Sequence, residues 1–487
     1  MTMTDMKRII LSFAAALAAF PAMAKITLPS VLSDDMVIQR NTEAALWGTA
    51  TPGKKVTVTT TWSKEKVSVV ADSETGKWKL RVRTPEAGGP YEITISDGTA
   101  LTLHNVLSGD VWYCGGQSNM EMRMQGYASQ PAHGAMEKIM TAKVTRPLRI
   151  CTIKKKSSVQ VQETSVGSWC VHSPENVAGA SATAYFFADY LQNVLDIPIG
   201  ILIDSWGGST IRTWMRQDII EKEFPEISID HLKGLKTVKS SDHSSASLLY
   251  NGQVAPIIPF TFKGMIWYQG EADRKRPEQY IRLQKAYVEM MRKDFEVPDA
   301  PFYYVQIAPY KYSDPDKFTL GYFCEAQQKC LEVIPNSGMA ATCDCGEFGT
   351  IHPNRKDLVG QRLAAQALVK TYGFKGIDAD APTYKSWEVK DGEILLTLNV
   401  GPQGVAPMGR ELEGFEVAGA DRVFHKAVAM RGKKGTHSNQ LVIKCDAVAE
   451  PVAIRYCFRN WSQGTVFNNF GIPLAPFRTD NWDDLVK

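Results

Sequence analysis

The sequence predicts an α/β protein in which a doubly wound parallel sheet is flanked by β-sandwich-like, β-rich segments. Three observations lead to this fold class. Compact apolar stretches alternate with segments of helical periodicity in the middle of the chain. Shorter strands with alternating apolar and polar residues precede and follow that region. Strands that are apolar on both faces and separated by helices are typical of a parallel sheet covered by helices.

The expected fold divides the chain into a leader and three domains. In the first domain, turns rich in glycine and proline recur about every ten residues, which indicates a β-sandwich. We expect a signal peptide (1–24), an N-terminal β-sandwich domain (25–108), an α/β domain (109–382) and a C-terminal β-rich domain (383–487). Within the α/β domain, apolar residues at helical spacing predict helices over 180–195, 279–295 and 356–372.

The first 24 residues differ in composition from the rest of the chain. Lys7 and Arg8 precede an apolar run over 9–20, and Ala22-Met23-Ala24 has the small-x-small form of a cleavage site. A run of this length is too short to span a bilayer. We therefore expect export, with cleavage near Ala24, and a periplasmic or secreted mature protein without a membrane span.

Composition excludes one large class of functions. The chain has 487 residues, of which 44% are hydrophobic and 22% charged, as in ordinary globular proteins. Its 55 basic and 52 acidic residues give a net charge of +3, and no basic run is longer than the three residues at 154–156. Such a charge distribution offers no electrostatic footprint for nucleic acid, so we expect no nucleic-acid partner.

The nine cysteines are irregularly spaced and do not describe a disulfide framework. Cys445 and Cys457 are the candidate pair for a single bridge. Cys343 and Cys345, close to His352, could suggest a metal site, but no second ligand pair has that spacing. We interpret them as small buried residues and expect neither a metal nor another cofactor.

Four predicted strands of the α/β domain end in polar, glycine-rich segments. These segments read GGQS (115–118), DSWGGS (204–209), YQGEAD (268–273) and GTIHP (349–353). In an open parallel sheet, ligands bind beyond the carboxyl ends of the strands. A serine after the first strand and a histidine after the last are the layout of serine-nucleophile hydrolysis. One such turn alone is more often structural, but four at one edge favour a catalytic site.

Four motifs within the α/β domain resemble those of the sialate O-acetylesterases, a family of SGNH-type hydrolases. They are CGGQSNMEM (114–122), DSWGGSTIRTWM (204–215), LLYNGQVAPIIPFTFKGMIWYQGEAD (248–273) and IHPNRKDLVGQRLA (351–364). LPSVLSDDMVIQR (28–40) and PFRTDNW (476–482) are similar to the β-rich flanks of that family. The resemblance thus extends over nearly the whole chain after the leader.

The resemblance implies a serine carboxylic-ester hydrolase that removes O-acetyl groups from sialic acids through an acyl-enzyme. The expected partner is therefore an O-acetylated sugar. Related SGNH esterases act on plant polysaccharides, so an acetylesterase of xylan or pectin is the alternative within the same fold. A catalytically inactive, carbohydrate-binding relative is the alternative from another functional class.

Carried over by position, Ser118 is the expected nucleophile and His352 the expected general base. The resemblance also implies an oxyanion hole built from the Ser118 amide, a glycine amide of the second loop and a side-chain amide of the third. We place the last two donors at Gly208 and Gln269. Fixed N–H donors are most valuable where the attacked ester carbonyl becomes an oxyanion.

The chain departs from the family in the residues before the histidine. Relatives carry an aspartate two or three residues ahead of it to orient the ring, whereas this chain has Gly349 and Thr350 there. Either the site is a Ser–His dyad, or Glu347 or Asp344 reaches the ring from further back. We favour Glu347, because it lies in the loop and nearer to the histidine.

Two arginines are candidates for binding the substrate. Sialic acid carries a carboxylate, and the planar guanidinium can bind both of its oxygens. Arg123 lies five residues after Ser118, and Arg212 follows the glycines of the second loop. A surface or ion-pairing role is as plausible for each arginine alone. Sialic acid is the favoured substrate over neutral xylan, which offers no group for such a cation.

Overall fold

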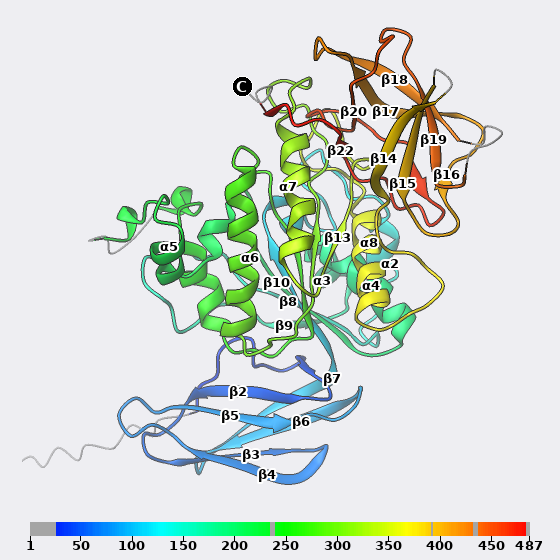
Figure 1. Ribbon diagram of the computed structural model, residues 1–487. Helices are drawn as coiled ribbons and strands as arrows, with labels where there is room; N and C mark the ends of the chain where they lie inside the picture. Colours follow the sequence, from blue (N-terminus) through cyan, green and yellow to red (C-terminus); the bar gives the residue numbers. More distant parts are fainter. Residues whose placement is uncertain (1–25, 234–238, 391–392, 432–436, 484–487) are drawn as a thin grey trace, which may run out of the picture.

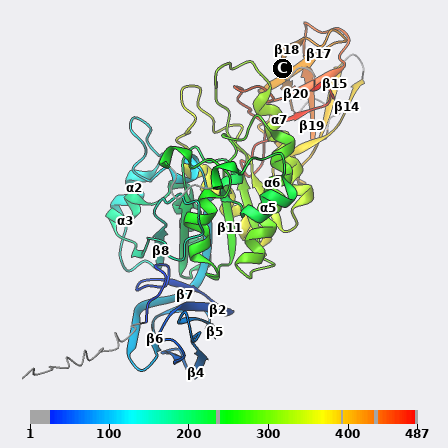
Figure 2. The same cartoon turned by 90° about the vertical axis from the view of Figure 1, so that its left-hand side faces the viewer.

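The structure, a computed structural model, describes residues 26–233, 239–390, 393–431 and 437–483. The expected signal peptide lies outside these residues. In Figure 1 the N-terminal β-rich part lies at one end of the central α/β part, and the C-terminal β-rich part lies at the other end. Figure 2 shows the same order from the side. The fold class predicted from the sequence is confirmed.

The N-terminal part consists of two sheets of mostly antiparallel strands. Its strands are β1 (Val37–Gln39), β2 (Glu43–Thr49), β3 (Lys55–Thr60), β4 (Ser63–Val70), β5 (Lys77–Arg83), β6 (Gly88–Ser96) and the beginning of β7 (Ala100–Gly116). β2 pairs with β5, while β3 pairs with β4 and β6, and β6 pairs with β7. Alternate side chains bury themselves, as Trp78, Leu80 and Val82 do along β5, because successive side chains of a strand point to opposite faces.

One strand runs through both the N-terminal part and the central sheet. β7 is 17 residues long, whereas strands usually have about 3–10 residues. Its first part pairs with β6, and its second part, from residue 110, pairs with β10 and β11. The expected boundary at 108/109 therefore falls inside a continuous strand. The strand ends at Gly116, two residues before Ser118.

The central sheet has the strand order β13-β12-β11-β7-β10-β8-β9. Its further strands are β8 (Leu148–Thr152), β9 (Trp169–Val171), β10 (Ile199–Ser205), β11 (Gly264–Tyr268), β12 (Phe302–Val305) and β13 (Ser337–Ala340). All neighbours pair in parallel except β8 and β9. The carboxyl ends of β7, β10, β11 and β13 consequently meet at one edge.

Helices cover both faces of this sheet. The α-helices are α1 (Ser118–Glu121), α2 (Ala135–Met140), α3 (Pro174–Gly179), α4 (Ala182–Leu195), α5 (Gln217–Glu223), α6 (Pro277–Asp294), α7 (Thr319–Val333) and α8 (Lys356–Lys370). Short 3₁₀ and π turns are η1 (Ile211–Trp214), η2 (Asp230–Leu232), η3 (Ser240–Asp242), η4 (Tyr250–Val254) and η5 (Ala255–Ile257). α4 and α8 share one hydrophobic cluster, and α6 and α7 belong to the other. α4, α6 and α8 confirm the three helices predicted from periodicity.

The C-terminal part is a seven-stranded antiparallel sheet with the order β14-β15-β19-β18-β17-β20-β22, beside the pair β16 and β21. Its strands are β14 (Thr383–Lys390), β15 (Glu393–Asn399), β16 (Val405–Ala406), β17 (Glu411–Ala418), β18 (Phe424–Met430), β19 (Gln440–Lys444), β20 (Ala453–Tyr456), β21 (Phe467–Asn468) and β22 (Phe477–Arg478). Cys445 and Cys457 are both free thiols, so the candidate bridge is not formed. The Cys445 Sγ instead contacts the Lys426 carbonyl, and Cys457 is buried.

The close approach of β7 and β11 explains the glycine before Gln117. Gly116 has φ +146°, and a Cβ there would lie 2.2 Å from the Tyr268 carbonyl oxygen. That same oxygen accepts a hydrogen bond from the Gln117 amide, at 3.0 Å. Only a residue without a side chain lets the strand end this close to its neighbour.

We predict that Gly116→Ala destabilises the fold more than Gly53→Ala. Gly53 also has a positive φ, +72°, but a Cβ there would meet nothing within 4 Å. The control variant should cost about 1–2 kcal/mol of strain. The Gly116 variant adds overpacking and should cost about 2–5 kcal/mol. Urea denaturation of both variants measures the difference. If the urea midpoints of the Gly116→Ala and Gly53→Ala variants shift equally, the close approach of Gly116 to the Tyr268 carbonyl is contradicted.

Candidate active site

A cavity of about 640 Å³ lies at the carboxyl ends of β7, β10 and β11. Its lining includes Ser118, Gly208 and His352, three residues singled out in the sequence. Glu271 of the third loop and Lys155 line it as well. The structure thus brings together the polar ends of four strands, which lie far apart along the chain.

The turn that carries Ser118 is held by hydrogen bonds to Ser118 itself and to its neighbour Gln117. Ser118 is the first residue of α1 and is separated from the end of β7 by Gln117 alone. The Gln117 side-chain oxygen accepts from the amides of Gly270 and Ala272, each at 3.2 Å. The Ser118 carbonyl accepts from the Tyr127 hydroxyl at 3.0 Å. The turn that carries the serine is therefore fastened to the loop after β11 and to the segment after α1.

The His352 ring is oriented by Gln130. The ring Nδ1 lies 2.9 Å from the Gln130 Oε1, which also accepts from the Thr350 hydroxyl at 2.8 Å. An amide oxygen only accepts, so Nδ1 carries the proton and Nε2 keeps a free lone pair. Tyr127 holds the other side of the ring, edge to face, with the ring centroids 5.1 Å apart. This tautomer is the one a general base requires.

Gln130 reaches the ring because its backbone is fixed in a tight turn. Tyr127 and Gln130 exchange two backbone hydrogen bonds, each of 3.0 Å. Sequence reasoning missed Gln130, because it belongs to no motif and lies in an irregular segment between α1 and α2. The contact joins residues 222 positions apart in the chain.

The electrostatics around His352 favour its neutral form. Burial lowers the pKa of the ring below its usual value, and the nearby Lys356 ammonium lowers it further. The Glu121 carboxylate opposes both effects by raising the pKa. Because a base must be unprotonated to act, a lowered pKa keeps His352 competent at neutral pH and below.

The structure corrects the expectation that Glu347 is the orienting acid. The Glu347 carboxylate accepts from the Asn354 amide at 2.7 Å, and a backbone bridge to Thr350 turns the loop in that direction. The alternative, Asp344, forms a two-point ion pair with Arg362, both contacts at 2.7 Å. Both carboxylates thus have other partners, and a neutral amide occupies the place of the acid.

The expected oxyanion donors are only partly assembled at the cavity. Gly208 lines it, as does Ser118. The neighbouring Gly207 amide is already bound to the Glu121 carboxylate, at 2.5 Å, which leaves Gly208 as the better-placed glycine. The expectation for Gln269 is corrected. Its buried side-chain nitrogen donates to Gln117, Ser209 and Asp273, and Gln269 is not among the residues that line the cavity.

Neither arginine proposed to bind substrate lines the cavity. Arg123 is exposed, and Arg212 is half-buried near Arg276 and Asp273, where burial lowers its pKa. Lys155 does line the cavity: its ammonium binds the Glu121 carboxylate at 2.6 Å and lies 5.5 Å from the centroid of the Trp206 ring. In the sequence, this lysine was visible only as part of a short basic run.

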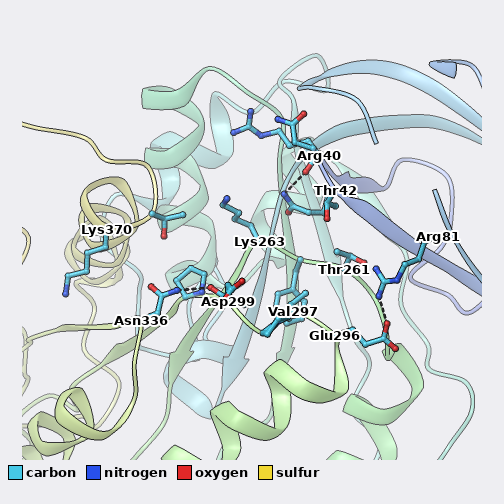
Figure 3. Close-up of a pocket in the computed structure, with 17 residues that line it drawn as sticks. Arg40, Thr42, Arg81, Thr261, Lys263, Glu296, Val297, Asp299, Asn336 and Lys370 are labelled. Carbon is cyan, nitrogen blue, oxygen red and sulfur yellow. Dashed lines mark hydrogen bonds and ion pairs between the residues drawn. The ribbon is translucent and has the colours of Figure 1, made fainter. Parts of the chain in front are cut away.

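A second hollow, of about 460 Å³, lies at the opposite edge of the sheet. Figure 3 shows it between the N-terminal part and the amino ends of β11 and β12, with Arg40, Lys263 and Glu296 among its lining. The Arg40 guanidinium is paired with Asp110, and the Arg81 guanidinium with Glu296. Ser118 and His352 do not line this hollow, so the candidate chemistry belongs to the first cavity.

The cysteines near His352 have partners within the fold. The Cys343 thiol donates to the Leu474 carbonyl, and Cys345 lies against the Arg362 guanidinium. Among residues 26–233, 239–390, 393–431 and 437–483, no group of three or more metal-ligating side chains is suited to an ion. Over the same described residues, no helix combines the length and the hydropathy needed to cross a membrane.

The chain is similar to known carbohydrate esterases in both sequence and fold. The family model for carbohydrate esterases described as sialic acid-specific acetylesterases matches residues 108–369. A sialate O-acetylesterase of Homo sapiens is 27% identical over 476 residues, covering 89% of this chain and 87% of that protein. One of Mus musculus is 28% identical over 517 residues, covering 92% and 93%. The crystal structure of a carbohydrate acetylesterase from Xanthomonas citri is 31% identical, with a TM-score of 0.82, and covers 94% of this chain and 100% of that chain.

We predict that Gln130→Glu raises the pKa of His352. A carboxylate at the position of the Gln130 amide favours the imidazolium, which should raise the pKa by about 1–3 units. Because the neutral ring is the active form, the acidic limb of kcat/KM should move to higher pH. Hydrolysis of p-nitrophenyl acetate as a function of pH measures it. Gln125→Glu, an exposed glutamine of the same segment, is the matched control. If the acidic limb of kcat/KM lies at the same pH in Gln130→Glu and Gln125→Glu, the contact between Gln130 and His352 is refuted.

Proposed function

Because the chain belongs to the carbohydrate esterase family of sialic acid-specific acetylesterases, we propose that it removes O-acetyl groups from sialic acids with Ser118 as nucleophile. The chain is a carboxylic-ester hydrolase, a carbohydrate O-acetylesterase. The observation that carries the proposed mechanism is that Ser118 and His352 line one cavity, with the His352 Nδ1 bound to Gln130.

The proposed reaction has two steps. In the first, the His352 Nε2 takes the proton of the Ser118 hydroxyl while the oxygen attacks the acetyl carbonyl. Amides of Ser118 and Gly208 are the proposed donors to the oxyanion. The imidazolium then gives its proton to the departing sugar hydroxyl and leaves an acetyl-enzyme. In the second step, His352 takes a proton from water as the water oxygen attacks the acetyl carbonyl, and it returns that proton to the Ser118 oxygen as the ester bond breaks and acetate leaves.

A neutral orienting group is sufficient for this chemistry. A carboxylate behind the ring stabilises the imidazolium as well as orienting it, whereas the Gln130 amide supplies the orientation and a weaker dipole. The acetyl ester of a sugar hydroxyl has a better leaving group than an amide. The demand on the base is correspondingly smaller, which supports an active enzyme over a binding-only relative.

We propose that Lys155 receives the carboxylate of the sialic acid. Lys155 lines the cavity beside Glu121 and Trp206, and its exposed ammonium can exchange its partner Glu121 for a substrate carboxylate. The adjacent Trp206 ring is half-buried and stacks on the His243 ring, with the centroids 4.8 Å apart, so the sugar can contact the part of the ring that this stacking leaves exposed. We also propose that the mature enzyme is exported, as the leader indicates.

A neutral acetylated polysaccharide is the second candidate substrate. The observation that favours it is the pairing of Lys155 with Glu121, which neutralises the ammonium before any substrate arrives.

We expect Ser118→Ala to remove nearly all esterase activity while the protein stays folded. Loss of a catalytic serine in a comparable site costs on the order of 10⁶ in kcat. Release of acetate from p-nitrophenyl acetate measures the loss. Ser228→Ala, at an exposed serine that does not line the cavity, is the control. If Ser118→Ala keeps more than about a tenth of the wild-type activity, the loss is far smaller than removal of a nucleophile causes. Another residue is then the nucleophile.

The substrate is tested with Lys155→Met on a panel of acetylated sugars. A charge-assisted hydrogen bond contributes roughly 1.5–3 kcal/mol, so KM for acetylated sialic acid should rise by about ten-fold or more. KM for acetylated xylan and for p-nitrophenyl acetate should hardly change. Lys154→Met, at the exposed neighbour, is the matched control. If the wild-type enzyme has a higher kcat/KM for acetylated xylan than for acetylated sialic acid, the substrate is the neutral polysaccharide and the sialate proposal is wrong.

A further inference from the structure

A lysine is buried directly behind the candidate catalytic pair. Lys356 opens α8, four residues after His352, and its side chain is fully buried. Its ammonium donates to the Asn119 side-chain oxygen and to the Pro353 carbonyl, both at 2.7 Å. The ammonium also lies 5.6 Å from the centroid of the Tyr268 ring. Burying a cation is costly, so packing alone does not account for a lysine here.

Asn119 connects this lysine to a buried carboxyl group. Its side-chain nitrogen donates to Glu271 at 2.5 Å and to the Ile351 carbonyl at 3.1 Å. Asn119 and Glu271 are both nearly inaccessible to solvent. The second carboxyl oxygen of Glu271 has no hydrogen-bond partner among the described residues. The side-chain amide of Asn119 thus connects the buried Lys356 ammonium to the buried Glu271 carboxyl through hydrogen bonds.

The partners of this network are the direct neighbours of the two reacting residues. Asn119 follows Ser118, and both Ile351 and Pro353 flank His352. The ammonium of Lys356 and the amide of Asn119 therefore fasten the histidine loop to the serine turn from below. An ammonium has three donors, so one group can bind carbonyls of two chain segments at once.

We propose that Lys356 is a positioning residue that sets the separation and the protonation of the Ser118–His352 pair, with Asn119 and Glu271 as its relay. The inference rests on the proposed function, because it takes Ser118 as the nucleophile and His352 as the base. Lys356 itself is buried and is not among the residues that line the cavity.

The charges around the two groups fix the direction of the pH effects. Burial lowers the pKa of Lys356 to about 7, while Glu271 after β11 and Cys345 and Glu347 after β13 oppose that shift. Tyr268 contributes its ring face from β11. His352 faces Lys356, whose charge lowers its pKa, then Glu121 of α1, which raises it, and the Tyr127 ring.

Lys356→Met tests the proposal, because methionine keeps the length of the side chain without the charge. Misplacement by about 1 Å can cost about 10²-fold, so kcat for p-nitrophenyl acetate should fall by about 10–100-fold. KM should change little. The acidic limb of kcat/KM should move to higher pH, because the cation that lowered the His352 pKa is gone. Lys356→Arg should restore that limb, and Lys370→Met, at the exposed end of α8, is the matched control.

The proposal is overturned if Lys356→Met keeps the wild-type kcat and acidic limb. It is also overturned if Lys356→Met lowers kcat but leaves the acidic limb of kcat/KM at the wild-type pH, and Lys356→Arg leaves it there too. That result would mean that Lys356 has a merely structural role. If circular dichroism shows that Lys356→Met is unfolded, Glu271→Gln provides the test instead. Without the Glu271 carboxylate the pKa of Lys356 falls, so the alkaline limb of kcat should move to lower pH. An unmoved or absent alkaline limb overturns the proposal.

Ser118→Ala separates this failure from failure of the proposed function. If that variant stays active, the assignment of the nucleophile fails whatever Lys356 does. If it is inactive while Lys356→Met behaves as wild type, the proposed function stands and only the positioning role is lost.

Discussion

The hydrogen bond between the His352 Nδ1 and the Gln130 side-chain oxygen decides which chemistry the cavity can perform. It fixes the tautomer that leaves Nε2 free to take a proton, and it does so without a formal charge. Gln130 is in turn held by its backbone exchange with Tyr127, whose hydroxyl binds the Ser118 carbonyl. One short segment after α1 therefore positions both the base and the nucleophile. Burial and the Lys356 charge then keep the pKa of His352 low, so the ring is neutral when it is needed.

The sheet supplies the rigid frame for this arrangement. β7 carries the serine at its end and continues without interruption into the N-terminal part, so the nucleophile is anchored in two sheets. β11 approaches it so closely that only glycine fits at position 116. The loop after β11 then binds Gln117 through two backbone amides. Catalytic geometry is thus built on strand ends, whose positions are fixed by the hydrogen-bond ladder, and is completed by loops.

The sequence was sufficient for the fold class, the three long helices and the gathering of Ser118 and His352, because these follow from periodicity and from parallel strands ending at one edge. It was not sufficient for side-chain direction. Gln269 is close in sequence to residues that line the cavity, yet its side-chain amide binds the buried Gln117, Ser209 and Asp273 instead. Glu347 is near His352 in sequence, but a local backbone bridge directs it to Asn354. Gln130 depends on a contact between distant segments, which no local pattern encodes.

Reaction with an alkyl fluorophosphonate, followed by intact-mass measurement and peptide mapping, tests the central claim most directly. Such a reagent phosphonylates a serine only where a neighbouring base activates it and nearby donors accept the new oxyanion. The account predicts a single adduct on the peptide that carries Ser118, formed much more slowly in His352→Ala. An adduct on another residue, or full labelling of the His352→Ala variant at the wild-type rate, would contradict it.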